Sequence, residues 1–277
     1  MAKPDVMMPA FQAPAWLVGC GNMAGAMVEG WRGAGLDFAG VTVIRPSGRP
    51  VEGVRTVTQY PDEMPNLVML GFKPQKLDEV APHLAPLVAA GTVIVSLLAG
   101  VEIASLRVRF PDARSIVRSL PNLPVAIGEG VIPLFGDGDA VHEIVELMRP
   151  LGMVIATGDE SALAGIGAIA GAGPAYVARF AEALAQAGRA HGVTADAMPI
   201  ALQTMSGSAA LMQATGEDGA ALSRRVASPG GTTEAGLAVL DRDSALDGLV
   251  EETIAAAIRR GHELAATAAV EHRAPLA

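Results

Sequence analysis

The chain has 277 residues, of which 51% are apolar and 18% are charged, and its formal net charge is −9. This acidity argues against a nucleic-acid-binding protein, which normally has a basic excess or stripe. No apolar run reaches the ~18–20 residues that span a bilayer. The single cysteine, Cys20, cannot form an intrachain disulfide, and the five histidines are not at metal-ligand spacing. We therefore expect a soluble, cytoplasmic protein without a metal site, a membrane span or a nucleic-acid partner.

The first half of the chain alternates short apolar runs with helical stretches. The predicted strands are residues 16–18, 41–44, 67–72, 92–97, 115–117 and 130–135, and the predicted helices are residues 23–32 and 75–90. The run 67–72 is continuous, which is typical of a strand buried on both faces of a parallel sheet. Strands that alternate with helices indicate βαβ units, so the pattern predicts an α/β Rossmann domain with a doubly wound, mostly parallel sheet.

Near residue 158 this alternation gives way to helical patterns alone. These patterns cover residues 175–191, 196–215, 233–240 and 244–268, and no convincing strand follows Glu160. We therefore predict a Rossmann domain at residues 1–158 and an all-α domain at residues 159–277. The helical half is rich in Ala and Gly and apolar on more than one face. This composition fits an internal bundle, or packing against a second copy of the chain, and we favour a homodimer.

A glycine turn links the first predicted strand to the first predicted helix. Its residues are Gly19, Cys20, Gly21, Asn22, Met23 and Ala24, a G-x-G-x-x-A pattern. In such a turn the first glycine permits the tight bend, the second lets the backbone approach a pyrophosphate, and a small third residue packs helix on strand. The helix N-terminus offers free N–H groups to the phosphates. The pattern predicts dinucleotide binding; the alternative is a close-packed turn without a ligand, in which Cys20 is only a spacer.

The end of the second strand distinguishes between the two nicotinamide dinucleotides. An acidic residue there would bind a ribose 2′-hydroxyl and favour NAD. This strand instead continues into Arg45, Ser47 and Arg49, with no acid. Arginine forms charge-assisted hydrogen bonds with a 2′-phosphate. We therefore predict NADPH as the cofactor, with NADH as the alternative; a solvated loop with two arginines is the plainer interpretation.

Further segments complete an ordered set along the chain. They are Phe72-Lys73-Pro74-Gln75, Leu98-Ala99-Gly100-Val101, Ser119-Leu120-Pro121-Asn122-Leu123-Pro124, Gly171-Ala172-Gly173-Pro174-Ala175-Tyr176 and Ser228-Pro229-Gly230-Gly231-Thr232-Thr233. In this order and spacing the set resembles pyrroline-5-carboxylate reductase, over roughly residues 16–264. The resemblance implies a Rossmann domain, a helical dimerisation domain, and a substrate site between them at a subunit interface. It also implies NADPH-dependent reduction of 1-pyrroline-5-carboxylate to L-proline, by dimers that in some members form decamers.

The resemblance assigns roles to particular residues. Thr233 hydrogen-bonds the imine nitrogen and is the catalytic candidate, while Glu217 lies close to the substrate amine. Bare glycine amides and a helix N-terminus suit the substrate carboxylate, although the same loop fits an ordinary capped helix start. The substrate-binding candidates are Glu217, Ser228, Gly230, Gly231, Thr232 and Thr233. The cofactor-binding candidates are Gly19, Cys20, Gly21, Asn22, Met23, Arg45, Ser47, Arg49, Phe72, Lys73, Pro74, Ala99 and Asn122.

Several residues depart from the pattern of the family. Ala170 and Ala172 replace serines, Leu123 replaces a threonine, and Ser223 and Arg224 replace a Lys-Asp pair. These changes leave two alternatives open: a related NADP-dependent reductase of a different cyclic imine, and an NADP-binding scaffold with impaired catalysis. A β-hydroxyacid reductase is disfavoured because residues 176–191 contain no lysine.

Overall fold

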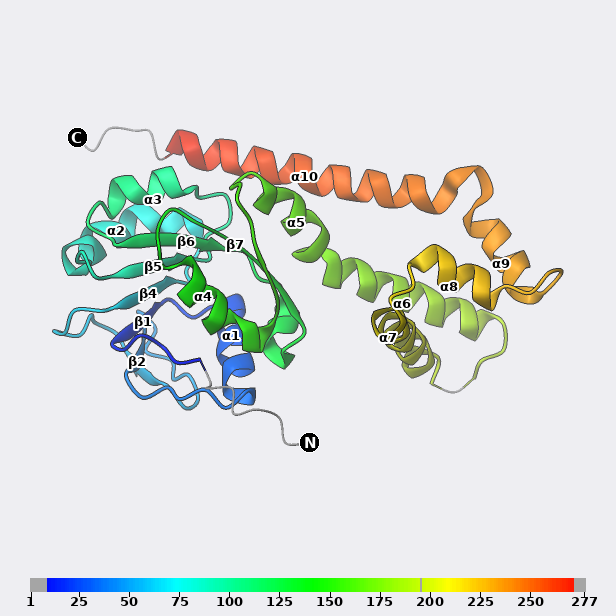
Figure 1. Cartoon of the computed structure of the whole chain (residues 1–277), viewed down its shortest axis with the longest axis horizontal. Helices are drawn as coiled ribbons and strands as arrows, with labels where there is room; N and C mark the ends of the chain where they lie inside the picture. The colour runs from blue at the N-terminus through cyan, green and yellow to red at the C-terminus, as the bar shows by residue number, and fades with distance from the viewer. Residues whose placement is uncertain (1–8, 195, 272–277) are drawn as a thin grey trace. The chain divides into compact units, whose positions relative to one another are not determined.

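The computed structural model describes residues 9–194 and 196–271 (Figure 1). Two compact units make up the chain: one runs to Ala172 and resumes at Ile258, and the other is Gly173–Ala257. The outermost residues of both predicted domains, 1–8 and 272–277, lie outside the described residues. The predicted boundary near residue 158 directly follows the last strand, whereas the first unit also contains the next helix. The boundary therefore stays a prediction.

One eight-stranded sheet forms the centre of the first unit, with strand order β3-β2-β1-β4-β5-β6-β7-β8. All neighbouring strands are parallel except β6 and β7, which are antiparallel. The strand order reverses at β1, which pairs with β2 on one side and β4 on the other. In open α/β sheets a ligand binds at such a reversal, beyond the carboxyl ends of the strands. The strands are β1 Ala15–Val18, β2 Val41–Ile44, β3 Arg55–Val57, β4 Leu67–Leu70, β5 Val93–Ser96, β6 Ser115–Ser119, β7 Gly130–Gly136 and β8 Gly152–Ala156.

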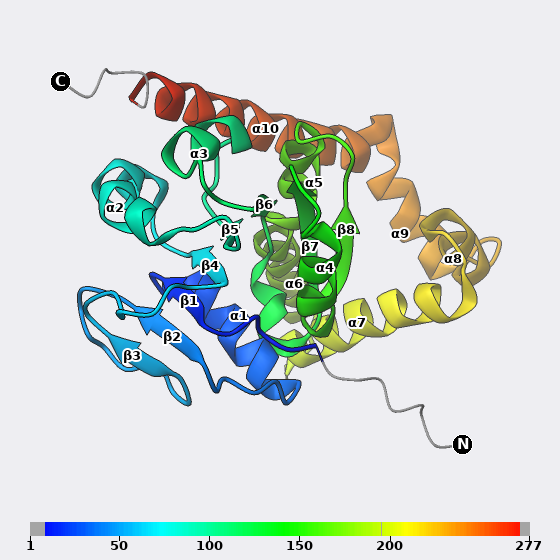
Figure 2. The ribbon, with the colours of Figure 1, turned by 60° about the vertical axis from the view of Figure 1, so that its left-hand side comes forward.

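Helices cover both faces of this sheet (Figure 2). One core contains residues of α1 and α4, including Met27 and Trp31, against one face of the strands. The other contains residues of α2 and α3, such as Leu77 and Leu106, against the opposite face. Because both faces are covered, β1, β2, β4 and β5 are buried at every position, which explains their continuous apolar runs. The helices are α1 Asn22–Gly33, α2 Leu77–Leu84, α3 Ile103–Arg109, α4 Val141–Met148 and α5 Ala162–Ala170.

The second unit is helical throughout its described residues. Its helices are α6 Gly173–Ala190, α7 Ala197–Thr215, α8 Gly219–Val226, α9 Thr232–Leu240 and the first part of α10 Ala245–Glu271. Its buried cluster contains only Ala185, Ala197 and Ala201, with Met198 packed beside them. Many large apolar side chains are exposed instead, among them Phe180, Leu184, Ile200, Leu202, Val239 and Leu249. A unit with so small a core and so much exposed apolar surface is typical of one that packs against another protein surface.

The predicted architecture is confirmed, with local differences. Strands β3 and β8 and helices α3, α4, α5 and α8 were not predicted. The single helix predicted at residues 75–90 is three pieces: the 3-10 turn Pro74–Lys76, helix α2, and the 3-10 turn Ala85–Leu87. Pro86 lies in the second 3-10 turn, and its missing N–H cannot continue the α-helical hydrogen bonds.

Candidate functional site

The glycine turn adopts the backbone geometry that the sequence predicts. Gly19 follows β1 with φ +80°, a left-handed conformation that favours glycine. Its N–H donates to the Ile44 carbonyl at 2.8 Å. A Cβ at Gly19 would lie 3.0 Å from the Gly71 carbonyl oxygen. Both the φ angle and the lack of space therefore require glycine here.

Gly71 is a partner in this turn that the sequence reasoning did not single out. Its N–H donates to the Val18 carbonyl at 2.9 Å, which joins the ends of β1 and β4. A Cβ at Gly71 would lie 2.8 Å from the Gly19 carbonyl oxygen and 3.0 Å from the Ala24 Cβ. Ala24 is buried, so the small third residue does pack α1 closely against the strands. The only sequence signal for Gly71 is its place at the end of an apolar run.

The first turn of α1 is open at its N-terminus. Gly21 is the N-cap in an extended conformation, and no side chain caps the helix. A Cβ at Gly21 would meet only the Gly71 carbonyl oxygen, at 3.9 Å. Packing within the described residues therefore does not require glycine at this position, and the free space would admit a ligand close to the backbone. Asn22 and Met23 begin the helix beside this space, and the arrangement fits a pyrophosphate.

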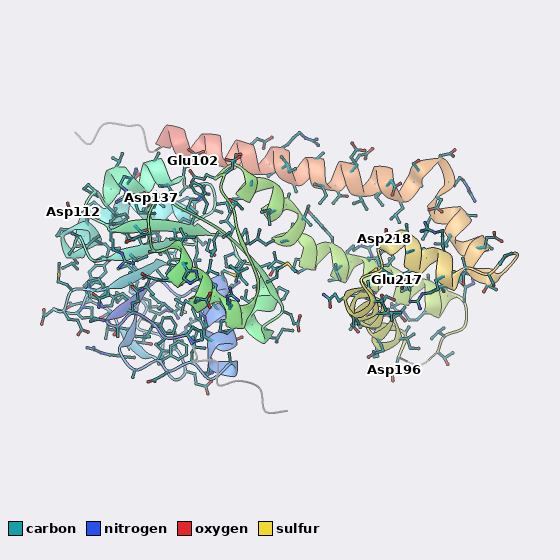
Figure 3. All side chains as sticks on the ribbon, viewed as in Figure 1. Glu102, Asp112, Asp137, Asp196, Glu217 and Asp218 are labelled. Carbon is teal, nitrogen blue, oxygen red and sulfur yellow. The ribbon has the colours of Figure 1, made fainter. Side chains whose placement is uncertain are left out.

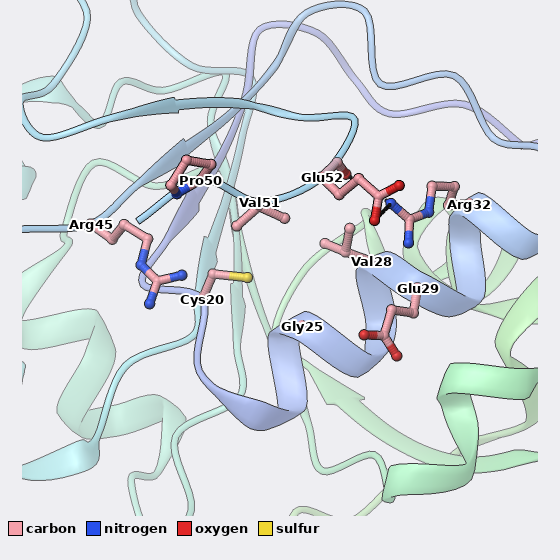
Figure 4. A pocket seen from close by; sticks show the side chains of 9 residues that line it. All are labelled: Cys20, Gly25, Val28, Glu29, Arg32, Arg45, Pro50, Val51 and Glu52. Carbon is pink, nitrogen blue, oxygen red and sulfur yellow. Dashed lines mark hydrogen bonds and ion pairs between the residues drawn. The ribbon is translucent and has the colours of Figure 1, made fainter. Parts of the chain in front are cut away.

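A hollow of ≈ 230 Å³ lies between the glycine turn and the loop after β2. Figure 4 shows Arg45 and Cys20 at one end and the Arg32–Glu52 pair at the other. Arg45 is half-buried, and its Nε donates to the Ser47 hydroxyl at 3.1 Å. This bond orients the guanidinium and leaves its two terminal nitrogens for a ligand. The lining residues are Cys20, Gly25, Val28, Glu29, Arg32, Arg45, Pro50, Val51 and Glu52.

The thiol of Cys20 is not activated by its surroundings. Burial raises the pKa of the Cys20 thiol, and the positive charge of Arg45 offsets this only in part. A raised pKa means less thiolate at neutral pH, and the thiolate is the reactive form. The spacer role expected for Cys20 is consistent with this environment.

The remaining cofactor candidates follow the carboxyl ends of neighbouring strands. Phe72, Lys73 and Pro74 follow β4, Ala99 follows β5, and Asn122 follows β6. Because β1, β2, β4, β5 and β6 are parallel, these positions share one edge of the sheet with the glycine turn. Lys73 and Ala99 are exposed, Phe72 is half-buried against the second core, and Arg49 is exposed in the loop after β2.

Asn122 is buried, and both ends of its amide are engaged within the protein. Its Oδ1 accepts from the Val131 N–H at 2.8 Å, and its Nδ2 donates to the Ala170 carbonyl at 2.9 Å. The side chain therefore ties the loop after β6 to β7 and to the end of α5. Its predicted contact with the nicotinamide ribose stays a prediction, for which the amide has a second N–H and a second oxygen lone pair.

The start of α5 is fastened to the same strand. The buried Arg118 of β6 forms an ion pair with Glu160 at 2.6 Å. The same Glu160 oxygen accepts from the Ile103 N–H at 2.8 Å. Side chains of β6 and its loop thus hold α5 at both ends, which fixes this helix to the nucleotide-binding sheet.

The loop before α9 differs in one respect from the expectation of two bare glycine amides. The Gly231 N–H donates to the Ser228 carbonyl at 2.9 Å, and the Gly230 N–H donates to Glu234 Oε2 at 2.6 Å. Both amides are therefore occupied, because the turn folds back on itself. The amides still available at this helix start belong to Thr232, Thr233 and Glu234, since first-turn N–H groups have no acceptor within their own helix.

Glu217 lies in the connection between α7 and α8, next to Asp218 (Figure 3). Its carboxylate forms an ion pair with Arg225 at 2.7 Å and accepts from the Thr215 hydroxyl at 3.4 Å. Asp218 caps α8 by accepting from the Ala221 N–H at 2.7 Å. The charge of Glu217 is thus already partly balanced by a neighbour that the sequence did not suggest.

Within residues 9–194 and 196–271, no three His, Cys, Asp or Glu side chains come together as a metal site. One stretch, Ala162–Ala190, is long and apolar enough by composition to cross a bilayer, and 17% of its most apolar window is buried. It comprises α5 and α6, and helices of soluble proteins meet the same criterion.

Comparison with known proteins agrees with these features. Residues 160–264 match the family described as pyrroline-5-carboxylate reductase dimerisation. The chain is 30% identical to a pyrroline-5-carboxylate reductase of Pseudomonas aeruginosa over 90% of this chain and 95% of that protein. It is 36% identical to one of Synechocystis over 72% of this chain and 74% of that protein. A solved pyrroline-5-carboxylate reductase of Coxiella burnetii superimposes with a TM-score of 0.83 at 29% identity, covering 92% and 99% of the two chains.

The match to the Pseudomonas protein, at 30% identity, covers 90% of this chain and therefore includes both units. The second unit also lies within the matched dimerisation region. The chain belongs to the pyrroline-5-carboxylate reductase family.

Proposed function

We propose that this chain reduces 1-pyrroline-5-carboxylate to L-proline, with NADPH as the hydride donor. The observation that carries the proposal is the open glycine turn at the strand-order reversal. There the left-handed Gly19 and the unfilled space at Gly21 leave the start of α1 accessible to a pyrophosphate. Membership of the family supplies the substrate and the reaction.

The first unit carries the residues that we assign to the cofactor. The glycine turn at residues 19–23 holds the pyrophosphate, and Arg45, Ser47 and Arg49 hold a 2′-phosphate, so NADPH is preferred over NADH. Phe72, Lys73, Pro74, Ala99 and Asn122 border the nicotinamide half at the same edge of the sheet. When bound, NADPH supplies the hydride, and the protein orients the reactants.

The second unit carries the residues that we assign to the substrate. The hydroxyls of Ser228 and Thr232 and the amides at the start of α9 hold the carboxylate. Thr233 hydrogen-bonds the imine nitrogen and favours its protonated, reducible form. A threonine hydroxyl is a weak acid, so the proton comes from water or arrives with the substrate. Glu217 balances the iminium charge electrostatically.

We further propose a homodimer through the helical unit, with a decamer as a possible higher assembly. The exposed apolar side chains of this unit, such as Phe180 and Ile200, support the dimer. The acidic net charge supports a small-molecule substrate rather than a nucleic acid. The single cysteine fits a reducing compartment, and we place the reaction in the cytoplasm.

A steady-state assay with 1-pyrroline-5-carboxylate and either NADPH or NADH tests the proposal. We expect efficient turnover, with a lower KM for NADPH. Turnover of another cyclic imine, but not of this one, would support the related imine reductase, which Ala170, Ala172 and Leu123 make worth testing. Binding of NADPH without turnover of any imine would support the scaffold.

A further inference from the structure

The substrate loop contains a side-chain contact that the family resemblance does not assign. Glu234 occupies the third position of α9, which begins at Thr232. Its carboxylate reaches back over the loop, and Oε2 accepts from the Gly230 N–H at 2.6 Å. Glutamate at this helix position is known to satisfy an amide that precedes the helix. Here the amide that it satisfies belongs to the loop that we assign to the substrate.

The conformation of this loop needs such a restraint. Gly230 has φ +70°, and a Cβ there would meet nothing within 4 Å, so the side of the residue where a side chain would lie is open. Gly231, in contrast, packs so closely on Ser228 that a Cβ would lie 2.5 Å from the serine Oγ. One hydrogen bond, from the Gly231 N–H to the Ser228 carbonyl, closes the turn beneath. The bond from Gly230 to Glu234 closes it from the helix side and fixes the exposed, intrinsically mobile glycine.

We propose that Glu234 is a positioning residue, which holds the loop at residues 228–231 in the conformation that receives the substrate carboxylate. The inference rests on the proposed function and deepens it. With the Gly230 amide taken by Glu234 and the Gly231 amide taken by Ser228, the substrate carboxylate binds the N–H groups of Thr232 and Thr233. The anion-binding amides are therefore those of the two threonines rather than those of the two glycines, and they lie beside the Thr233 hydroxyl that contacts the imine.

The hydrogen bond, rather than the negative charge, performs this role. A carboxylate beside an anion site repels the substrate, so the charge itself opposes binding. A glutamine has nearly the same shape, and its amide oxygen can accept from the Gly230 N–H. Glu234→Gln keeps the restraint and removes the repulsion, whereas Glu234→Ala removes both.

Steady-state kinetics of both variants with 1-pyrroline-5-carboxylate test the proposal. We expect Glu234→Ala to raise the KM for 1-pyrroline-5-carboxylate about three- to tenfold, which corresponds to the loss of one hydrogen bond that orders the loop. The KM for NADPH stays within about twofold, because the lost hydrogen bond lies in the loop assigned to 1-pyrroline-5-carboxylate and not among the residues assigned to NADPH. Glu234→Gln has a KM for 1-pyrroline-5-carboxylate equal to or below that of the wild type. Asp241→Asn is the matched control, because Asp241 is an exposed acid at the opposite end of α9.

Two results would overturn the proposal. An unchanged or lower KM in Glu234→Ala would mean that Glu234 competes with the substrate or does nothing. Equal damage by Gln and Ala would mean that the charge, and not the hydrogen bond, is what matters. Hydrogen exchange at the Gly230 amide gives a second readout, with protection expected in the wild type and the Gln variant and lost in the Ala variant. If the wild type shows a protected Gly230 amide but does not reduce 1-pyrroline-5-carboxylate, the proposed function is refuted. The substrate-positioning role is then refuted with it, although the hydrogen bond itself is present.

Discussion

Replacement of Arg45 by alanine should separate the two nicotinamide cofactors. Arg45 lines the hollow beside the glycine turn, and the Ser47 hydroxyl orients its guanidinium. A hydrogen bond to a charged group contributes roughly 1.5–3 kcal/mol. Because Arg45 is only half-buried, solvent screening reduces this to about 1–2 kcal/mol. That free energy corresponds to a rise of about 5- to 30-fold in the KM for NADPH.

Initial rates at fixed 1-pyrroline-5-carboxylate, with NADPH or NADH varied, measure this effect. The KM for NADH should change by less than about twofold, because NADH has no 2′-phosphate for a charge-assisted bond. Arg55→Ala is the matched control: Arg55, on β3, is also an exposed arginine, but it does not line the hollow. Equal increases in KM for both cofactors would refute the 2′-phosphate role of Arg45.

The remaining predictions concern the turn and its supports. Gly19→Ala should destabilise the protein by about 1–3 kcal/mol and weaken NADPH binding, since φ is +80° and Gly71 leaves no room; wild-type affinity in a cofactor titration would contradict this. Asn122→Ala should lower the free energy of unfolding by about 1–3 kcal/mol, because two hydrogen bonds to buried or half-buried backbone are lost; an unchanged denaturation midpoint would argue otherwise. Alkylation of Cys20, followed by mass spectrometry, should be slower at neutral pH than that of a free thiol and slower again with NADPH. The reason is that the raised pKa of Cys20 leaves less thiolate at neutral pH; rapid modification at neutral pH would contradict the burial of the thiol.

The sheet could be predicted from the sequence because its central strands are buried on both faces. Burial on both faces imposes continuous apolar runs, and those of β1, β2, β4 and β5 are unmistakable. The edge strand β3 has only three residues and begins with an exposed arginine, so no such run marks it. Helix α8 has only eight residues and buries none of them, so too few positions mark its apolar face in the sequence.

The candidate site was predictable to the level of residue type but not of hydrogen bonding. The glycines of the turn and the Ser-Pro-Gly-Gly-Thr-Thr loop stand out because their backbone requirements restrict the sequence. Which amides remain free depends on how a turn folds back, and Gly230 and Gly231 proved to be occupied. Asn122 is a similar case, because the sequence marked it as a candidate residue but did not predict its hydrogen bonds with Val131 and Ala170.

Two departures from the family pattern, Ala170 and Leu123, are compatible with the scaffold that the structure shows. The Asn122 amide bonds the backbone carbonyl of residue 170, so an alanine in place of a serine at that position leaves this support intact. Leu123 opens a 3-10 turn and is 54% exposed, so a threonine there would lose little packing. Both substitutions therefore leave the buried contacts of the fold in place, and we expect them to act on catalysis rather than on stability. A variant with Ala170→Ser and Leu123→Thr should differ from the natural chain in kcat or KM and not in its melting temperature.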